Sequence, residues 1–291
     1  IFNSGAAIGG IISAPIVGLL FIWFGSWQAT FITIGVLGLL WLVPWLIVYK
    51  SGPKTHPWLD EAEREYILTG QRNEETHQAA EYAPTSREIL SRKESWGVIL
   101  ASFFLDPIWW LFVGWLPLYL NETYGFGVAE IASFAWIPYV GAMFGAWFGG
   151  LLAQNRISAG WTVNKARKFV ISLGGLIMLI SLLLTIKAAT PIVAVLLMAA
   201  ILFGFQTAVG NIQTLPSDFY SGKSVGSLAG FAGTAAKLAV VLLNFLIPVI
   251  TVNSYAPAFA VGAGLAIMTV VSVFILCPHI QPLSPRSADS A

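Results

Sequence analysis

Long apolar runs recur along almost the whole chain and are separated by short polar stretches. A bilayer core about 30 Å thick requires about 20 apolar residues per helix, and the runs have this length. They lack the strict alternation of polar and apolar residues that a membrane β-strand shows. The pattern therefore predicts eight membrane-spanning helices. Their expected limits are 4–24, 28–49, 97–120, 128–152, 168–187, 191–214, 225–249 and 255–277.

The composition indicates the same class of protein. Of the 291 residues, 57% are hydrophobic and 10% are charged, and the mean hydropathy is +0.77. Soluble domains carry roughly 25% charged residues, so this chain cannot cover a water-facing surface. We interpret it as an all-α polytopic membrane helix bundle. The net charge of +1 also argues against nucleic-acid binding, which needs a concentrated basic surface.

Lysines and arginines gather on one side of the predicted spans. The segment 50–96 contains seven and the segment 153–168 contains four, whereas the opposite side has only Lys187. Positive residues are enriched in cytoplasmic loops. We therefore expect both termini of this chain to be cytoplasmic and the protein to lie in the inner (plasma) membrane.

The segment 50–96 divides the predicted spans into a pair and a group of six. It holds 16 charged residues, and we interpret it as a solvated connector without chemistry of its own. Asp60 and Glu63 have the spacing of a capping box, which predicts a short surface helix over about 61–70. The expected organisation is two helices in 1–49, the connector in 50–96, a six-helix bundle in 97–277 and a cytoplasmic tail in 278–291.

Residues suited to catalysis or metal binding are scarce. Cys277 is the only cysteine, which excludes an internal disulfide and a thiolate metal cluster. His56, His77 and His279 fall in polar loops or the tail, where they cannot form a buried metal site. The sequence shows neither an enzyme's nucleophile–base or paired-carboxylate cluster nor the repeated polar rings of a channel. We therefore expect no enzymatic activity, no metal and no cofactor.

Six segments of the chain carry recognisable motifs, beginning with "FNSGAAIGGIISAP" and "GSWQATF". These two are similar to the fifth and sixth helices of the anion:cation symporter branch of the major facilitator superfamily, and the other segments resemble its hexuronate transporter group. The match continues into the eleventh helix. The segments are 2–15, 25–31, "FLDPIWW" (104–110), "GWLPLYL" (114–120), "GWTVNKARK" (160–168) and "LPSDFYSGKSVGSLAG" (215–230).

The resemblance implies a twelve-helix fold of which this chain carries about eight helices, the first four being absent. It implies proton-coupled symport of a hexuronate or a similar sugar acid by alternating access, in a protein that acts as a monomer in lipid. Galactonate, sugar phosphates, simple carboxylates and an uncoupled facilitator are the alternatives. In this family the arginine that holds the substrate and the proton-carrying acids lie mainly in the absent helices, so we expect this piece alone not to transport.

The chain departs from the family pattern at "GGLLAQNRISAG" (149–160). Family members usually have an acidic residue after these glycines, and Gln154 and Asn155 take its place here. The contact that family members use as a cytoplasmic gate latch thus lacks its usual charge in this chain.

Lys237 is a positive charge in the middle of a predicted span. It lies roughly 18 Å from either end of its helix, which is farther than a lysine side chain reaches. A charge at the centre of a helix costs about 2.5–3.5 kcal/mol on insertion scales, so we expect Lys237 to face a wet cavity. A substrate or coupling contact, a structural ion pair and a misassigned span are the open interpretations.

Asp106 is the acidic residue well inside the third predicted span, and Pro107 follows it. Proline interrupts a helix and aspartate caps the part that restarts, so a capped kink and a role in proton or substrate coupling are equally consistent with the sequence.

Trp109 and Trp110 come next. Indole rings stack on sugar rings and donate hydrogen bonds, so we assign both to substrate binding.

Uncharged polar residues at mid-depth complete the candidate site. Gln206 and Asn211 are assigned to the pocket because two glycines of the same span allow close approach, and hydrogen bonding between helices is the alternative. Tyr119, Trp136 and Tyr139 are placed to bind sugar hydroxyls.

Small residues recur every four positions in two stripes and nearly so in a third, a spacing that lets membrane helices approach closely. Helix sliding during gating and static packing both explain such stripes. The stripes are Gly141, Gly145 and Gly149; Gly5, Gly9 and Ser13; and Gly226, Gly230 and Gly233.

Overall fold

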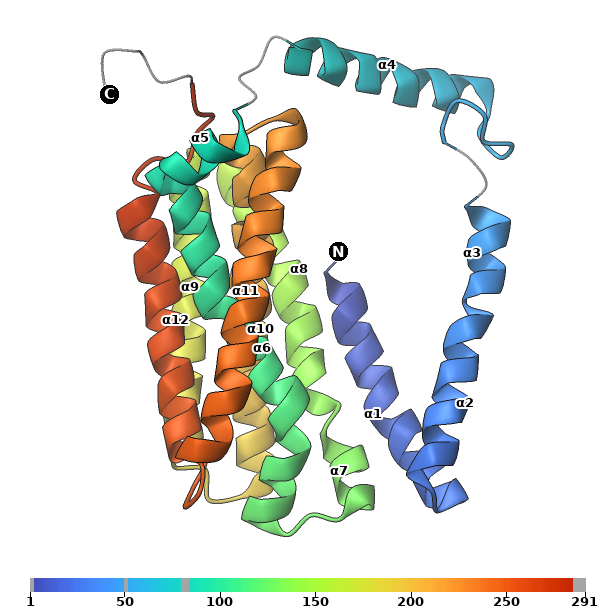
Figure 1. Cartoon of the computed structure of the whole chain (residues 1–291), viewed down its shortest axis with the longest axis vertical. Helices are drawn as coiled ribbons and strands as arrows, with labels where there is room; N and C mark the ends of the chain where they lie inside the picture. Colours follow the sequence, from blue (N-terminus) through green and yellow to red (C-terminus); the bar gives the residue numbers. More distant parts are fainter. Residues whose placement is uncertain (1–2, 50–51, 80–83, 285–291) are drawn as a thin grey trace.

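In the computed structural model, residues 3–49, 52–79 and 84–284 are described, and every regular element in them is a helix (Figure 1). The prediction of an all-α membrane bundle is confirmed. The helices are α1 (Ser4–Phe24), α2 (Trp27–Leu40), α3 (Leu42–Val48), α4 (Glu61–Ala79), α5 (Ser86–Ser91), α6 (Lys93–Tyr124), α7 (Val128–Phe134), α8 (Ile137–Ser158), α9 (Val163–Thr185), α10 (Pro191–Phe219), α11 (Gly222–Ile250) and α12 (Ala256–Leu276).

Eight stretches of helix in the described residues are long and apolar enough to cross a membrane, as the hydropathy pattern predicts. Two of them are interrupted. Pro44 cannot donate a hydrogen bond to the preceding turn, and α2 gives way to α3 at Trp41. A second break separates α7 from α8, where Pro138 occupies the first turn of the new helix.

Several spans run past the predicted limits. Helix α6 has 32 residues, which at 1.5 Å per residue is about 48 Å and exceeds the hydrocarbon core of about 30 Å. Helix α10 ends at Phe219 rather than near 214. Hydropathy marks only the apolar part of each span, whereas the backbone hydrogen bonds carry the helix on into the polar layer.

The connector contains two helices. Asp60 Oδ1 accepts a hydrogen bond from the Glu63 backbone N–H at 2.7 Å, so α4 begins where the capping spacing predicts. It continues to Ala79, beyond the expected end near 70. The short α5 was not predicted, although Thr85 and Glu88 form its capping box. Residues 50–51 and 80–83 of the connector, and 285–291 of the tail, lie outside the described part.

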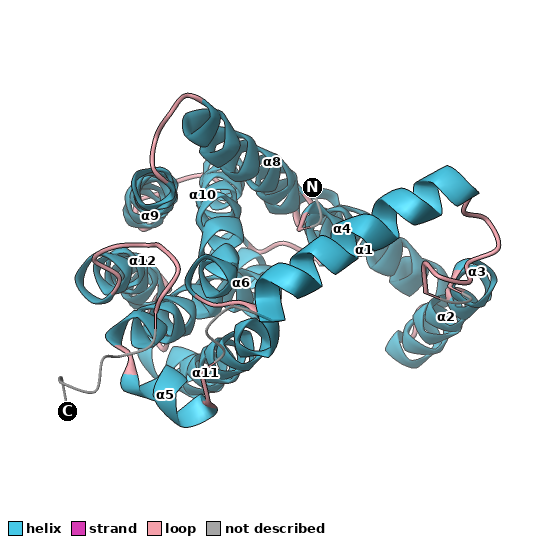
Figure 2. Cartoon of the chain, turned by 90° about the horizontal axis from the view of Figure 1, so that it is seen from above, coloured by secondary structure: helices cyan, strands magenta, loops and turns pink. Residues whose placement is uncertain are grey.

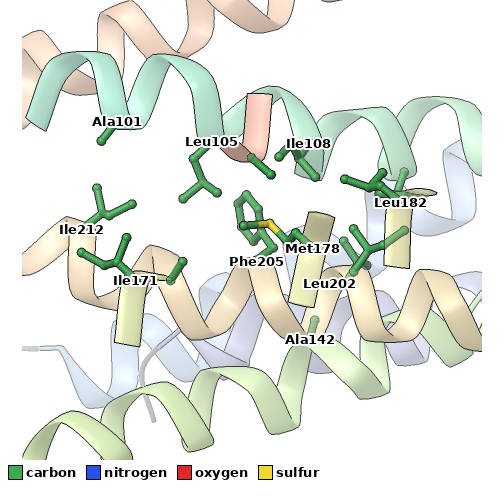
Figure 3. Packing of buried hydrophobic residues seen from close by; sticks show 14 of the residues in the cluster. Ala101, Leu105, Ile108, Ala142, Ile171, Met178, Leu182, Leu202, Phe205 and Ile212 are labelled. Carbon is green, nitrogen blue, oxygen red and sulfur yellow. The ribbon is translucent and has the colours of Figure 1, made fainter. Parts of the chain in front are cut away.

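Six spans, formed by α6 and α8–α12, pack around a shared apolar core (Figure 2). In Figure 3, Leu105 and Ile108 of α6 meet Phe205 and Leu202 of α10, with Met178 of α9 between them. Helix α10 is central because it packs against α8, α9, α6 and α11. Helix α1 packs against α7 and α8, while α2 and α3 lie apart from the bundle (Figure 1).

The glycine stripe on α8 packs against α10. A Cβ atom at Gly141, Gly145 or Gly149 would collide with the backbone of Ala199, Phe203 or Thr207 respectively. Because the two backbones lie so close, side chains of α10 reach the stripe. Thr207 Oγ1 donates a hydrogen bond to the Gly145 carbonyl and Asn211 Nδ2 donates one to the Gly149 carbonyl, both at 3.3 Å. The stripe therefore holds two helices of the same six-helix group together.

The other two stripes lie in open surroundings. A Cβ added at Gly5 or Gly9 would have no neighbour within 4 Å, and the same holds for the stripe on α11. The tight contacts of α1 come instead from Gly10 against Tyr139 and from Gly18 against Ala132.

The basic side chains predicted to share one side gather at one end of the bundle, here called the basic end and defined by Arg92, Arg156, Lys165 and Lys223. Residues 278–284 cross this end. Their backbone receives a hydrogen bond from Lys168 Nζ to the Pro278 carbonyl at 2.8 Å, and the Leu283 N–H donates to the Phe219 carbonyl at 2.9 Å. The first part of the tail is thus attached to α9 and α10.

The stripe can be tested with Gly145→Ala. The added methyl group has no room against the backbone of α10, so we expect the free energy of unfolding to fall by about 1–3 kcal/mol. Thermal unfolding of the purified protein in detergent measures this. Gly150→Ala is the matched control on the same helix, because its Cβ meets open space and alanine favours a helix by roughly 0.5–1 kcal/mol. Equal unfolding midpoints for the two variants would contradict the packing role.

Candidate functional site

A pocket of about 420 Å³ lies between α6, α10 and α11 and combines apolar walls with a few polar groups. Both charged residues predicted inside the membrane, Asp106 and Lys237, line it. Its lining residues are Val98, Ser102, Leu105, Asp106, Val209, Ile212, Gln213, Pro216, Ala229, Ala232, Gly233, Ala236 and Lys237. We refer to it as the central pocket.

Helix α6 brings Asp106 to the central pocket without a break. The helix runs unbroken from Lys93 to Tyr124 through both Pro107 and Pro117, so Asp106 does not cap a restarted helix. Its carboxylate instead reaches α11. Of the two interpretations left open by the sequence, the structure does not show the capped kink.

Asp106 and Lys237 form an ion pair across the central pocket. Lys237 Nζ lies 2.6 Å from Asp106 Oδ2, and it also lies 5.1 Å from the centre of the Trp110 ring. The Lys237 side chain is 60% exposed, whereas that of Asp106 is 23% exposed. The pair thus buries its anion more deeply and leaves its cation open to a ligand.

Gln213 supplies the amide of the central pocket. Its Oε1 accepts a hydrogen bond from Asn3 Nδ2 at 2.9 Å, so the start of α1 touches α10 beside the pocket. Gln213 is not among the candidate residues selected from the sequence. It lies seven residues after the selected Gln206, which is two helical turns along the same face, and this spacing is the signal that was available.

Trp109 and Trp110 point to different neighbours. Trp110 lies next to Lys237, whereas Trp109 packs edge-on against Tyr139 at 5.8 Å and against Phe205 at 5.4 Å between ring centres. Successive helix residues diverge by about 100°, so adjacent tryptophans on one helix cannot share one partner. Only Trp110 contacts the charged pair.

Tyr119 lies in a second pocket of about 430 Å³, at the end opposite the basic end. It packs against Tyr255 and Phe259, and its hydroxyl is 3.2 Å from that of Tyr124. The Tyr255 hydroxyl donates to Glu122 Oε2 at 2.8 Å. The structure therefore separates Tyr119 from the group around Lys237.

Gln206 and Asn211 are both buried, with 5% and 2% exposure. Asn211 Nδ2 donates to the Gly149 and Thr207 carbonyls, and its Oδ1 accepts from Arg167. Gln206 Oε1 has no hydrogen-bond partner among the described residues. Asn211 thus joins three helices, which is the interhelical alternative, while Gln206 keeps a free acceptor.

No group of three or more His, Cys, Asp and Glu side chains suited to a metal ion occurs in the described residues. The polar residues that line the central pocket are Ser102, Asp106, Gln213 and Lys237, and the Trp110 ring lies beside Lys237.

Comparison with known proteins identifies the family. Residues 1–243 match the sequence profile of the Major Facilitator Superfamily. The chain belongs to this superfamily. A solved structure with the same arrangement, a bacterial homologue of the human lysosomal transporter Spinster in an inward-facing and unoccupied conformation, aligns with 95% of this chain and 67% of that chain at a TM-score of 0.50 and 15% identity.

Similar members of the superfamily are anion transporters. The chain is 33% identical over 286 residues to the hexuronate transporter of Escherichia coli strain K12, covering 96% of this chain and 64% of that protein. It is 40% identical over 182 residues to the galacturonate transporter of Dickeya chrysanthemi, covering 61% of this chain and 51% of that protein. The chain thus spans less than two thirds of the length of these relatives.

This superfamily member carries a second ion pair near the basic end. Arg167 Nε of α9 lies 3.0 Å from Asp218 Oδ2 of α10, and Arg167 Nη1 donates to Asn211 at 3.1 Å. Both charged side chains are less than one fifth exposed. This ion pair joins α9 to α10 and therefore lies within the six-helix group.

The Arg167 network can be tested with Arg167→Met. Removing the guanidinium leaves the mostly buried Asp218 carboxylate and the Asn211 amide oxygen without their contact to Arg167. We therefore expect the free energy of unfolding to fall by about 2 kcal/mol. Arg156→Met is the control, because Arg156 is exposed and its contact with Trp161 is worth less than about 1 kcal/mol. Chemical unfolding in detergent compares them, and equal midpoints would show that the network does not stabilise the fold.

Proposed function

We propose that the protein is a secondary active transporter that carries a hexuronate or a similar sugar-acid anion together with protons by alternating access. The observation that carries this proposal is the largely exposed side chain of Lys237, which lines the central pocket in the middle of a membrane bundle. A cation at this depth is costly unless it serves a wet cavity or a charged partner. The relatives that transport hexuronate and galacturonate support the choice of substrate.

The central pocket suits the parts of a sugar acid. The Lys237 ammonium binds a carboxylate through a charge-assisted hydrogen bond, and the Trp110 indole beside it offers an apolar face to a pyranose ring. Gln213 provides both a donor and an acceptor for hydroxyl groups. These three residues form the substrate contacts we propose, whereas Trp109, Gln206 and Tyr139 do not line the central pocket.

Proton coupling is assigned to Asp106. It is the acidic side chain that lines the central pocket, and it contacts the cation that would bind the substrate. Alternating access would then occur around this site, as in transporters whose substrate binds near the membrane midplane. We place the protein in the inner (plasma) membrane as a monomer, with the basic end cytoplasmic.

Two alternatives remain within the transport class. One is another organic anion, since a probable L-galactonate transporter of Escherichia coli strain K12 is 27% identical over 297 residues. The other is an uncoupled facilitator, in which Asp106 would only hold Lys237 in place. Comparing uptake of glucuronate and galactonate with and without a proton gradient separates these possibilities.

The proposal predicts proton-dependent uptake of glucuronate by the full-length protein in proteoliposomes. Lys237→Ala removes the partner of the carboxylate and should raise the apparent KM about ten- to a hundredfold, which corresponds to one charged hydrogen bond. Lys223→Ala is the matched control, because this lysine lies at the basic end of the same helix and is exposed. Unchanged kinetics in Lys237→Ala would assign Lys237 a structural role, and flux that ignores the gradient would remove the coupling.

A further inference from the structure

The ion pair of the central pocket is arranged so that a second anion can compete for its cation. Lys237 has three N–H donors, and Asp106 is its one hydrogen-bond partner among the described residues. Its side chain is more than half exposed while that of Asp106 is mostly covered. Within the described residues, Lys237 is therefore the more accessible member of the pair.

The net charge of the central pocket follows from the charged residues that line it and those of the helices packed around it. Asp106 and Lys237 are the charged residues that line the pocket, and α10 contributes the uncharged Gln213. Helix α12, which packs against α6, contains no Asp, Glu, Lys, Arg or His. The other charged residues of α6 and α11 lie near their ends. Within the described part of the chain, the charges that line the pocket therefore sum to zero, and an anion that binds without a proton would add one negative charge deep in the membrane, which is unfavourable.

We propose that the substrate carboxylate displaces Asp106 from Lys237 and that Asp106 takes up one proton in the same step. This inference rests on the proposed function and specifies how its site couples anion and proton. The ion pair, the substrate anion and one proton become a protonated Asp106 and a new ion pair between Lys237 and the substrate. Both the empty and the loaded pocket then carry zero net charge.

This exchange of Asp106 for the substrate carboxylate makes the affinity for the anion depend on pH. The loaded pocket holds one proton more than the empty pocket, so lowering the pH favours binding. Because one proton is taken up per anion bound, the affinity for the anion should rise about tenfold for each unit by which the pH is lowered. A structural ion pair would produce no such dependence on this residue.

The test uses Asp106→Asn in the full-length protein. Asparagine has nearly the same shape but cannot take up the proton, and it no longer competes for Lys237. We expect glucuronate to bind with an affinity at least equal to that of the wild type and independent of pH, with one proton fewer taken up per glucuronate. Tryptophan fluorescence, which Trp110 beside Lys237 should report, measures binding between pH 5 and 8, and an indicator dye in weak buffer measures proton uptake.

Two variants complete the experiment. Glu122→Gln is the matched control on α6, because Glu122 binds Tyr255 in the second pocket, and it should keep the pH dependence of the wild type. Lys237→Gln should lose affinity for glucuronate while Asp106→Asn keeps it. Thermal unfolding confirms that each variant is folded. If Lys237→Gln and Asp106→Asn lose binding to the same extent, the ion pair has a structural role and the exchange is overturned.

Failure of the exchange and failure of the proposed function give different results. If the wild type binds glucuronate and Asp106→Asn takes up as many protons as the wild type, the exchange and the assignment of proton coupling to Asp106 are wrong, while the proposed transport of a sugar acid with protons stands. If the wild type binds galactonate but not glucuronate, the proposed substrate is wrong, and the pH dependence of galactonate binding in Asp106→Asn decides the exchange. If the wild type binds neither anion, both proposals are contradicted.

Discussion

Close contact between helix backbones at glycine determines where α10 lies, and the position of α10 determines the central pocket. The stripe Gly141, Gly145 and Gly149 admits the α10 backbone on one side, and Gly174 of α9 meets Gly204 of α10 on another. Membrane helices lack a hydrophobic drive to associate, so such contacts supply the packing instead. With two sides of α10 held in this way, the face that carries Val209, Ile212 and Gln213 turns toward α6 and α11 and lines the pocket.

Among the described residues, two ion pairs join membrane helices, and their surroundings differ. Arg167 and Asp218 are both mostly covered, share Asn211 with α8 and lie near the end of the bundle. Lys237 and Asp106 lie near the middle of their helices, and the lysine is largely exposed. A covered pair with further hydrogen bonds is suited to holding helices together, whereas an exposed cation retains the capacity to bind another anion. The distinction separates a packing contact from a binding site in a bundle that carries few charges.

Sequence reasoning found individual residues of the site more readily than their partners. Lys237 and Asp106 stand out separately because a charge within an apolar run is rare, but nothing in the sequence pairs residues 131 positions apart. Trp109 and Trp110 were assigned together, although their side chains face different helices. Tyr119 was grouped with the pocket because it follows the same helix, yet it lies toward the far end of that helix beside Tyr255. Depth and direction along a long helix were the missing information.

The sequence by itself determined the number of spans, the all-α class, the basic asymmetry and the start of α4. Each of these depends on local terms, namely the transfer of an apolar run into lipid, the charge of a loop or a capping side chain. Only the tertiary structure decided that Asp106 binds Lys237, that Asn211 binds Arg167 and that Gln213 lines the pocket. These contacts depend on which helix faces meet, and in a membrane that choice follows from close packing between helices, which a hydropathy pattern does not encode.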